Sequence, residues 1–219
     1  MTKEQITLLK SFTAVSQSFY LKKGTIGVLS ADQSCCLFYD ANDFTDFETA
    51  APIYDVNEFL AVLDTFGAES EIITDQKFIT IKNGNKKIRY MLSTESVIDV
   101  PTTLETKFVG FPQDIVFTLN KNDLEQIKKI SSLLGLKDIK FSLKGKKVTI
   151  ELNENDNQSS DSFKIELAGS GNEVVCSINT EEIKKIIPGD YDVTISSIGM
   201  SRFVSKNISS LRYFIANLA

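Results

Sequence analysis

The residues best able to do chemistry in this chain are carboxylates, lysines and three cysteines, since histidine is absent. Without histidine there can be no Ser-His-Asp or Cys-His catalytic set and no histidine-ligated metal. The commonest general base near neutral pH is also missing. Chemistry based on carboxylates or lysine remains possible, so the composition favours binding or scaffolding without excluding an enzyme.

Two short stretches resemble ligand-binding loops in part. Residues 153–157 (NENDN) are rich in oxygen ligands, but they lack the central glycine and terminal glutamate of an EF-hand calcium loop. Gly169-Ser170-Gly171 resembles a phosphate loop, but neither Gly-Lys-Ser/Thr nor a long helix follows it. We interpret the first as a solvated turn and the second as a strand connection. The sequence therefore predicts no metal, no cofactor and no catalytic residue.

The cysteines predict a reducing environment. Cys35 and Cys36 are adjacent, so they point to opposite faces of a strand and a disulfide between them would be strained. With Cys176 the count is odd and has no metal-ligand spacing, which indicates reduced thiols in a cytosol-like compartment. No apolar stretch approaches the ~20 residues that cross a bilayer, and the N-terminus lacks the apolar region of a secretory signal.

The helices and strands that would position a functional site follow a pattern that repeats along the chain. Each repeat begins with a capping residue three places before Glu, Asp or Gln and then an apolar residue, as in a capping box. The four signatures begin at Thr2, Asp55, Asn120 and Asn179. Repeated use of one supersecondary unit at this spacing predicts the architecture of the protein, but it does not by itself predict a chemical activity.

Hydrophobic periodicity predicts a helix and then strands in each repeat. The expected helices cover residues 2–15, 55–66, 121–134 and 180–187. The expected strands or extended runs are 18–22, 25–30, 35–39, 44–53, 78–82, 87–92, 115–119, 139–143, 148–152, 162–167, 191–196, 202–206 and 211–215. Lys23-Gly24 predicts a hairpin turn between the first two strands.

Residues 93–113 break this rhythm with two prolines and a glycine, which suit a connector. The sequence therefore predicts an α+β protein with two similar domains, 1–92 and 114–219, joined by the connector 93–113. Each domain would hold two modules of a helix plus antiparallel strands.

Several stretches, in this order, resemble the sliding clamps of T-even phages, which are DNA polymerase processivity factors. The stretches are residues 8–12 (LLKSF), 51–60 (APIYDVNEFL), 123–126 (DLEQ) with 145–150 (GKKVTI), and 188–191 (PGDY). Residues 211–216 (LRYFIA) are similar to the last strand of the eukaryotic proliferating-cell clamp. The resemblance covers essentially the whole chain.

The resemblance implies a DNA-clamp fold that closes as a ring around duplex DNA, with helices lining the hole and sheets outside. Its expected partners are double-stranded DNA bound without regard to sequence, the phage DNA polymerase and a clamp loader, in the cytoplasm of an infected bacterial host. A hole about 35 Å wide has a circumference of about 110 Å, which about a dozen helices spaced 8–10 Å apart would line. One chain supplies four, so a homotrimer suffices.

Three sets of site residues follow from the resemblance. The lysines expected to face DNA are Lys3, Lys10, Lys121, Lys128, Lys184 and Lys185. The pocket expected to bind a partner peptide comprises Val109, Phe111, Pro112, Ile198, Met200, Phe214 and Ala216. The expected subunit interface pairs Ile88, Tyr90 and Leu92 with Phe163, Ile165 and Leu167 of the next copy.

Each set has an ordinary alternative. Acids in first turns and lysines later in a helix satisfy the helix dipole alone, and the net charge of −5 argues against tight direct DNA affinity. Phe111 and Phe214 could simply pack the connector onto the second domain, and the two strands could form intrachain hairpins.

A β-rich structural or virion-associated protein and a histidine-free enzyme are the rival functions. The former has no need of four capped helices, and no paired carboxylates or nucleophile-base set supports the latter.

Overall fold

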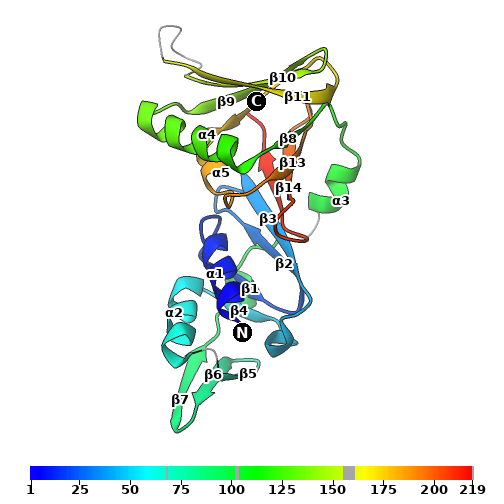
Figure 1. Cartoon of the computed structure of the whole chain (residues 1–219). Helices are drawn as coiled ribbons and strands as arrows, with labels where there is room; N and C mark the ends of the chain where they lie inside the picture. Colours follow the sequence, from blue (N-terminus) through cyan, green and yellow to red (C-terminus); the bar gives the residue numbers. More distant parts are fainter. Residues whose placement is uncertain (68, 102–103, 155–160, 219) are drawn as a thin grey trace. The chain divides into compact units, whose positions relative to one another are not determined.

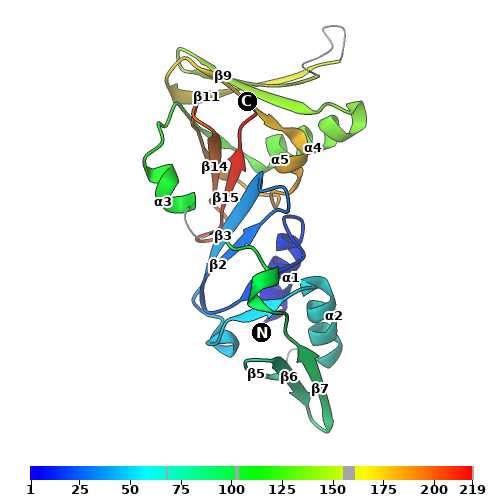
Figure 2. The ribbon, with the colours of Figure 1, turned by 180° about the vertical axis from the view of Figure 1, so that it is seen from behind.

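The computed structural model describes residues 1–67, 69–101, 104–154 and 161–218, and divides into two compact units, residues 1–102 and 103–219 (Figures 1 and 2). The division falls inside the predicted connector 93–113. That segment is not free of secondary structure, because it contains the 3-10 helix η2 (Glu95–Val97) and the short helix α3 (Leu104–Val109). Each unit combines helices with antiparallel strands, which confirms the predicted α+β class.

The two helices of unit 1 begin at the predicted capping residues. Thr2 precedes α1 (Lys3–Phe12) and forms a complete capping box with Gln5, in which each side chain accepts a hydrogen bond from the other residue's backbone N–H. Asp55 precedes α2 (Val56–Phe66), and its carboxylate accepts the backbone N–H of the third helical residue. These bonds satisfy N–H groups that have no partner within the helix, so they fix where each helix starts.

The same rule holds in unit 2. Asn120 caps α4 (Lys121–Leu134), which matches the predicted helix in full. Asn179 caps α5, but its side chain accepts from Glu181, one residue earlier than the capping box predicts. Helix α5 (Thr180–Lys184) is also shorter than the predicted 180–187.

Unit 1 contains three small antiparallel arrangements: β1 with β4, β2 with β3, and β5-β6-β7 in that order. Their bounds are β1 (Phe19–Leu21), β2 (Gly24–Leu29), β3 (Cys35–Ala41), β4 (Ala51–Ile53), β5 (Glu71–Thr74), β6 (Phe78–Asn83) and β7 (Lys86–Met91). The predicted hairpin at Lys23-Gly24 is wrong, because β1 pairs with β4 and the Lys23 N–H donates to the Phe47 carbonyl at 2.8 Å. The predicted extended run 44–53 contains the 3-10 helix η1 (Thr45–Phe47), and β5 was not predicted.

The core of unit 1 forms where α1 and α2 lie side by side (Figure 1). Leu9 and Phe12 of α1 and Phe59 and Leu60 of α2 have no exposed surface. Leu9 and Phe12 are three positions apart and Phe59 and Leu60 are adjacent, so the buried residues of each helix lie on one side of it. Both helices therefore turn an apolar face toward the core. Burial of these side chains supplies the main favourable free energy of the unit.

Unit 2 is built on eight antiparallel strands in the order β12-β9-β10-β11-β8-β13-β14-β15. Their bounds are β8 (Ile115–Leu119), β9 (Asp138–Lys144), β10 (Lys147–Asn153), β11 (Phe163–Gly171), β12 (Val175–Asn179), β13 (Tyr191–Ile195), β14 (Met200–Ser205) and β15 (Arg212–Ala216). Strand β12 was not predicted. Both views place α4 and α5 on one side of the central strands and α3 on the other (Figures 1 and 2).

Strand β11 changes partner part-way along its length. Residues 163–168 pair with β10, and residues 169–171 pair with β8. Gly169 and Gly171 permit the change: an added Cβ would lie 2.4 Å from the Val148 side chain at the first position and 2.0 Å from the Asp114 carbonyl oxygen at the second. Gly169-Ser170-Gly171 is therefore part of a strand rather than the predicted connection between strands, and close backbone approach explains its glycines.

Candidate DNA-facing helices, peptide pocket and subunit edges

Four of the six lysines predicted to face DNA lie near carboxylates. Lys10 Nζ lies 4.0 Å from Asp64, which joins α1 to α2. On their own helices, Lys121 lies 3.8 Å from Glu125, Lys184 2.6 Å from Glu181, and Lys185 2.7 Å from Glu182. Lys3 is exposed at the start of α1. The helices therefore present a mixed, partly neutralised field rather than a strongly cationic one.

Lys128 is placed differently from the other five. Its ammonium donates to the backbone carbonyl of Lys184 at 3.2 Å and to that of Ile186, so it joins α4 to the end of α5. Burial lowers the pKa of Lys128 to about 8, against an opposing effect of the nearby Glu125 carboxylate. Carbonyls at a helix C-terminus lack intrahelical partners, and a cation satisfies them. The structure thus shows a helix-joining role for Lys128, and its predicted DNA contact stays a prediction.

The predicted peptide pocket divides into two groups of residues. The pairs Met200–Ala216 and Arg202–Phe214 stand directly opposite each other on β14 and β15, so their side chains share one face of the sheet. The alternate residues, such as Phe203, are fully buried on the other face. Val109, Pro112 and Ile198 are exposed at the surface; Val109 has 85% of its surface open and Ile198 55%.

Phe108, which the sequence reasoning missed, is the residue that holds α3 on that face. Its ring lies 5.3 Å from the ring of Phe214 and 5.9 Å from that of Phe111, and the Arg202 guanidinium sits 5.1 Å from its centre. Phe108 is 4% exposed, whereas Phe111 is only half-buried. Phe108 thus packs α3 onto Phe214, while Val109, the residue after Phe108, is exposed. The only signal for Phe108 in the sequence was that it is apolar and directly precedes Val109, a residue of the predicted pocket.

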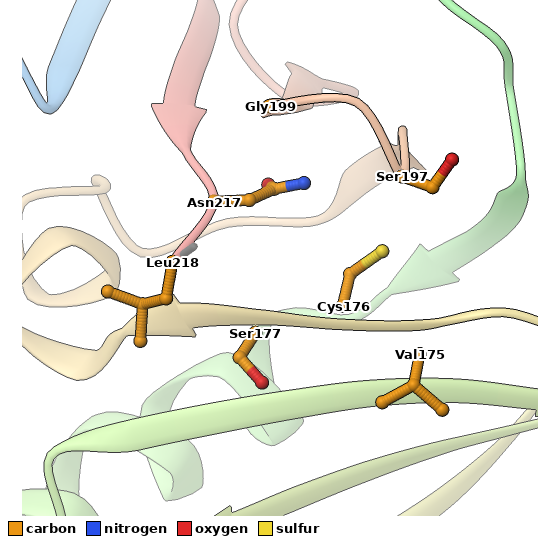
Figure 3. A pocket seen from close by; sticks show the side chains of 7 residues that line it. All are labelled: Val175, Cys176, Ser177, Ser197, Gly199, Asn217 and Leu218. Atoms are coloured by element: carbon orange, nitrogen blue, oxygen red, sulfur yellow. The ribbon is translucent and has the colours of Figure 1, made fainter.

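A cavity of about 500 Å³ lies next to the turn that carries Ile198. It is lined by Val175, Cys176, Ser177, Ser197, Gly199, Asn217 and Leu218. Figure 3 shows the Cys176 sulfur pointing into the space between β12 and that turn. The Leu218 N–H donates to the Ser177 carbonyl at 2.7 Å, so the two ends of the strand order of unit 2 meet at this cavity.

Asp114 holds the same turn in place. One carboxylate oxygen accepts the Ser197 N–H at 2.7 Å and the other accepts the Asn172 side chain at 3.0 Å. These hydrogen bonds lower the pKa of the buried Asp114 carboxyl, and the bond from Ser197 has the largest effect. A single carboxylate therefore fixes the start of β8, the turn after β11 and the turn that carries Ile198.

The two strands predicted to join neighbouring copies both have open edges in the described part of the chain. Strand β7 is last in the order β5-β6-β7, and residues 163–168 of β11 pair only with β10. Tyr90 on β7 packs its ring 5.1 Å from Phe59 and donates its hydroxyl to the Asp55 carbonyl. Ile165 on β11 stands opposite the buried Ile150. The apolar side chains of β7 and β11 thus continue the buried core of their own unit, but they are themselves only half-buried.

Comparisons with known proteins agree with this architecture. Residues 116–219 match the family model described as gp45 sliding clamp, C terminal. The chain is 28% identical to a sliding clamp of Vibrio phage KVP40, over 100% of this chain and 99% of that protein. It is 26% identical to a sliding clamp of Escherichia phage RB69, over 99% of this chain and 95% of that protein. Over its whole length the chain is therefore similar to phage sliding clamps.

Solved structures show the clamp fold as well. The proliferating cellular nuclear antigen of Entamoeba histolytica has a TM-score of 0.70 at 12% identity, covering 98% of this chain and 95% of that one. A DNA polymerase sliding clamp of Pseudomonas aeruginosa also has a TM-score of 0.70 at 12% identity, covering 100% of this chain and 66% of that one. These likenesses confirm the predicted DNA-clamp fold.

Within the ranges described, no group of three or more cysteine or carboxylate residues is arranged to hold a metal ion. No helix in those ranges is long and apolar enough to span a bilayer. The calcium-loop stretch 153–157 lies partly outside the described residues. The three cysteines lie outside any disulfide and are buried.

Proposed function

We propose that this sliding clamp closes as a homotrimer around duplex DNA and tethers the phage DNA polymerase, after a clamp loader places it on DNA. The observation that carries the proposal is the whole-length similarity to two phage sliding clamps. The four capped helices α1, α2, α4 and α5 support three copies, because about twelve helices would line a hole wide enough for a hydrated duplex. The role is one of binding, without catalysis, inside an infected bacterium.

Loose contact with DNA suits the charges on the helices. Carboxylates lie near most of the predicted DNA-facing lysines, and the net charge is −5. Tight binding would need many unpaired cations at phosphates and would depend steeply on salt. A ring needs no such affinity, because closure around the duplex prevents escape. The rival of a β-rich structural protein is not favoured, since the matching proteins are clamps.

Primer extension on a long primed single-stranded circle tests this function. With the phage polymerase and loader, wild-type clamp should raise the product length per binding event many-fold. Ile165→Asp should abolish the gain, because a carboxylate on the apolar face of β11 opposes subunit pairing. Lys144→Asp, an exposed change on β9 of the same unit and outside the proposed edge, is the control for folding and charge. Equal product lengths with and without wild-type clamp would overturn the proposal.

We also propose that the polymerase peptide docks beside α3, at the exposed apolar residues Val109 and Ile198. Small apolar anchors on a surface are typical of sites where a short peptide concentrates its binding energy in a few contacts. Val109→Asp and Ile198→Asp should each weaken binding of the polymerase C-terminal peptide at least ten-fold in calorimetry. Val97→Asp is the matched control, since Val97 is also exposed, at 53%, within the predicted connector. Unchanged affinity in both test variants would remove these residues from the site.

A further inference from the structure

We infer that β7 of one copy pairs with β11 of the next in a single antiparallel register, which sets Lys87 opposite Ala168, Arg89 opposite Glu166 and Met91 opposite Lys164. The inference rests on the proposed ring. It goes further by fixing which residues of the two edges face each other and which charge pair selects that register.

The free backbone groups on β7 point in a definite direction. The Leu92 N–H donates to the Lys77 carbonyl across the β6–β7 ladder. Because bonded and non-bonded positions alternate in an antiparallel pair, even-numbered residues of β7 bond to β6 and odd-numbered ones point outward. Lys87, Arg89 and Met91 thus present their N–H and C=O groups at the open edge.

The same argument applies to β11. The Gly169 N–H donates to the Lys146 carbonyl across the β10–β11 ladder, so odd-numbered residues bond to β10. The Asn172 N–H donates to the Asp114 carbonyl on the opposite side, which agrees with this alternation. Residues 164, 166 and 168 therefore present their backbone groups outward. The proposed register places these three opposite the three outward residues of β7, which allows about six hydrogen bonds.

Side chains satisfy the same register. Ile88, Tyr90 and Leu92 would stand opposite Leu167, Ile165 and Phe163, so each half-buried apolar residue meets another one. On the exposed face the Arg89 guanidinium would stand opposite the Glu166 carboxylate, which at present lies 2.8 Å from Lys147. Opposite charges at facing positions stabilise an antiparallel pair, and like charges oppose it.

Neighbouring registers that keep these faces are less favourable on physical grounds. A two-residue shift in one direction would place Lys87 opposite Ser170, which already faces Val116 of β8. The opposite shift would pair Lys87 with Glu166, but it would also place Arg89 against Lys164, two cations, and the apolar Leu92 against the acid Asp161. On β7 the edge ends at Ser93, whose N–H donates to the Pro52 carbonyl.

Paired cysteines test the register directly. Facing residues in a bonded pair have Cα atoms about 5.5 Å apart, within disulfide range, whereas diagonal neighbours are about 7–8 Å apart. Under mild oxidation, Lys87→Cys with Ala168→Cys should give cross-linked dimers and trimers on a non-reducing gel. Lys87→Cys with Glu166→Cys should give several-fold less. The single variants are controls, and the native cysteines are buried.

The outcomes separate this inference from the proposed ring. Stronger cross-linking of the 87–166 pair in a particle of three-subunit mass would overturn the register and leave the ring intact. A trimeric particle in which neither pair cross-links would overturn the use of these edges. A monomeric mass at micromolar concentration would overturn the ring itself.

A charge exchange provides a second, independent measurement. Arg89→Glu and Glu166→Arg should each raise the dissociation constant of the trimer several-fold, and the double variant should restore most of the loss. A double variant no better than the worse single one would show that the two side chains do not face each other.

Discussion

At the scale of single residues, two ionisable groups, the buried Asp114 and the half-buried Lys128, tie elements of unit 2 together. Asp114 accepts hydrogen bonds from two separate turns, and Lys128 donates to carbonyls at the end of α5. Neither role could be read from the sequence, because each depends on partners between 56 and 83 positions away. The sequence presented Lys128 only as one helical lysine among several.

Asp114→Asn should lower the free energy of unfolding by about 1–3 kcal/mol at neutral pH, since an amide offers one acceptor where the carboxylate serves two donors. Asp192→Asn, an exposed change in the same unit, should cost far less. Because hydrogen bonding lowers the folded-state pKa of Asp114, its stabilising effect is full above the ordinary carboxyl pKa and fades as pH falls through the lowered value. Urea unfolding at several pH values measures both effects. Equal losses in the two variants would contradict this role.

Lys128→Met should change how stability depends on alkaline pH. The folded-state pKa of Lys128 is about 8, below its ordinary 10.5, so between these values the unfolded chain binds more protons and this group makes stability rise with pH. Its contribution is therefore complete above 10.5 and lost as pH falls through 8. Unfolding at pH 8–9.5, below the tyrosine titrations, should show a flatter profile in Lys128→Met than in wild type. Lys129→Met on the exposed neighbour should leave the profile unchanged.

At the scale of elements, four capping side chains decide where the helices begin. Asn120→Ala should destabilise unit 2 by about 1 kcal/mol, because it removes the acceptor for the Asp123 N–H at the start of α4. Asn122→Ala, two positions further along the exposed first turn, is the matched control. Thermal unfolding measures the difference, and no difference between these variants would contradict the importance of the cap.

The predictability of the fold follows from how local each signal is. Caps and apolar periodicity act within a few residues, so α4 and β8 match their predicted bounds in full. The hairpin at Lys23-Gly24 failed because β1 pairs with β4, about thirty residues away. At the pocket, Phe108 packs against both Phe214 and Phe111, and this contact depends on where α3 lies on the sheet, which composition does not reveal.

At the scale of the whole molecule, the proposed function as a DNA clamp depends on closure of the ring rather than on any single contact. In the proposed ring, the partly neutralised helices would attract DNA weakly and without regard to sequence, and the open edges of β7 and β11 would link the copies. These two features are complementary, since a closed ring that held phosphates tightly could not slide freely. The central claim is therefore topological.

Release on linearisation tests that claim most directly. Clamp is loaded onto a nicked circular duplex by the loader, freed from unbound protein by gel filtration, and half of the sample is cut once with a restriction enzyme. The account predicts that clamp stays on the circles for many minutes, leaves the cut DNA quickly, and is held on cut DNA whose ends are blocked by bound protein. Equal retention on circular and open-ended linear DNA would contradict it.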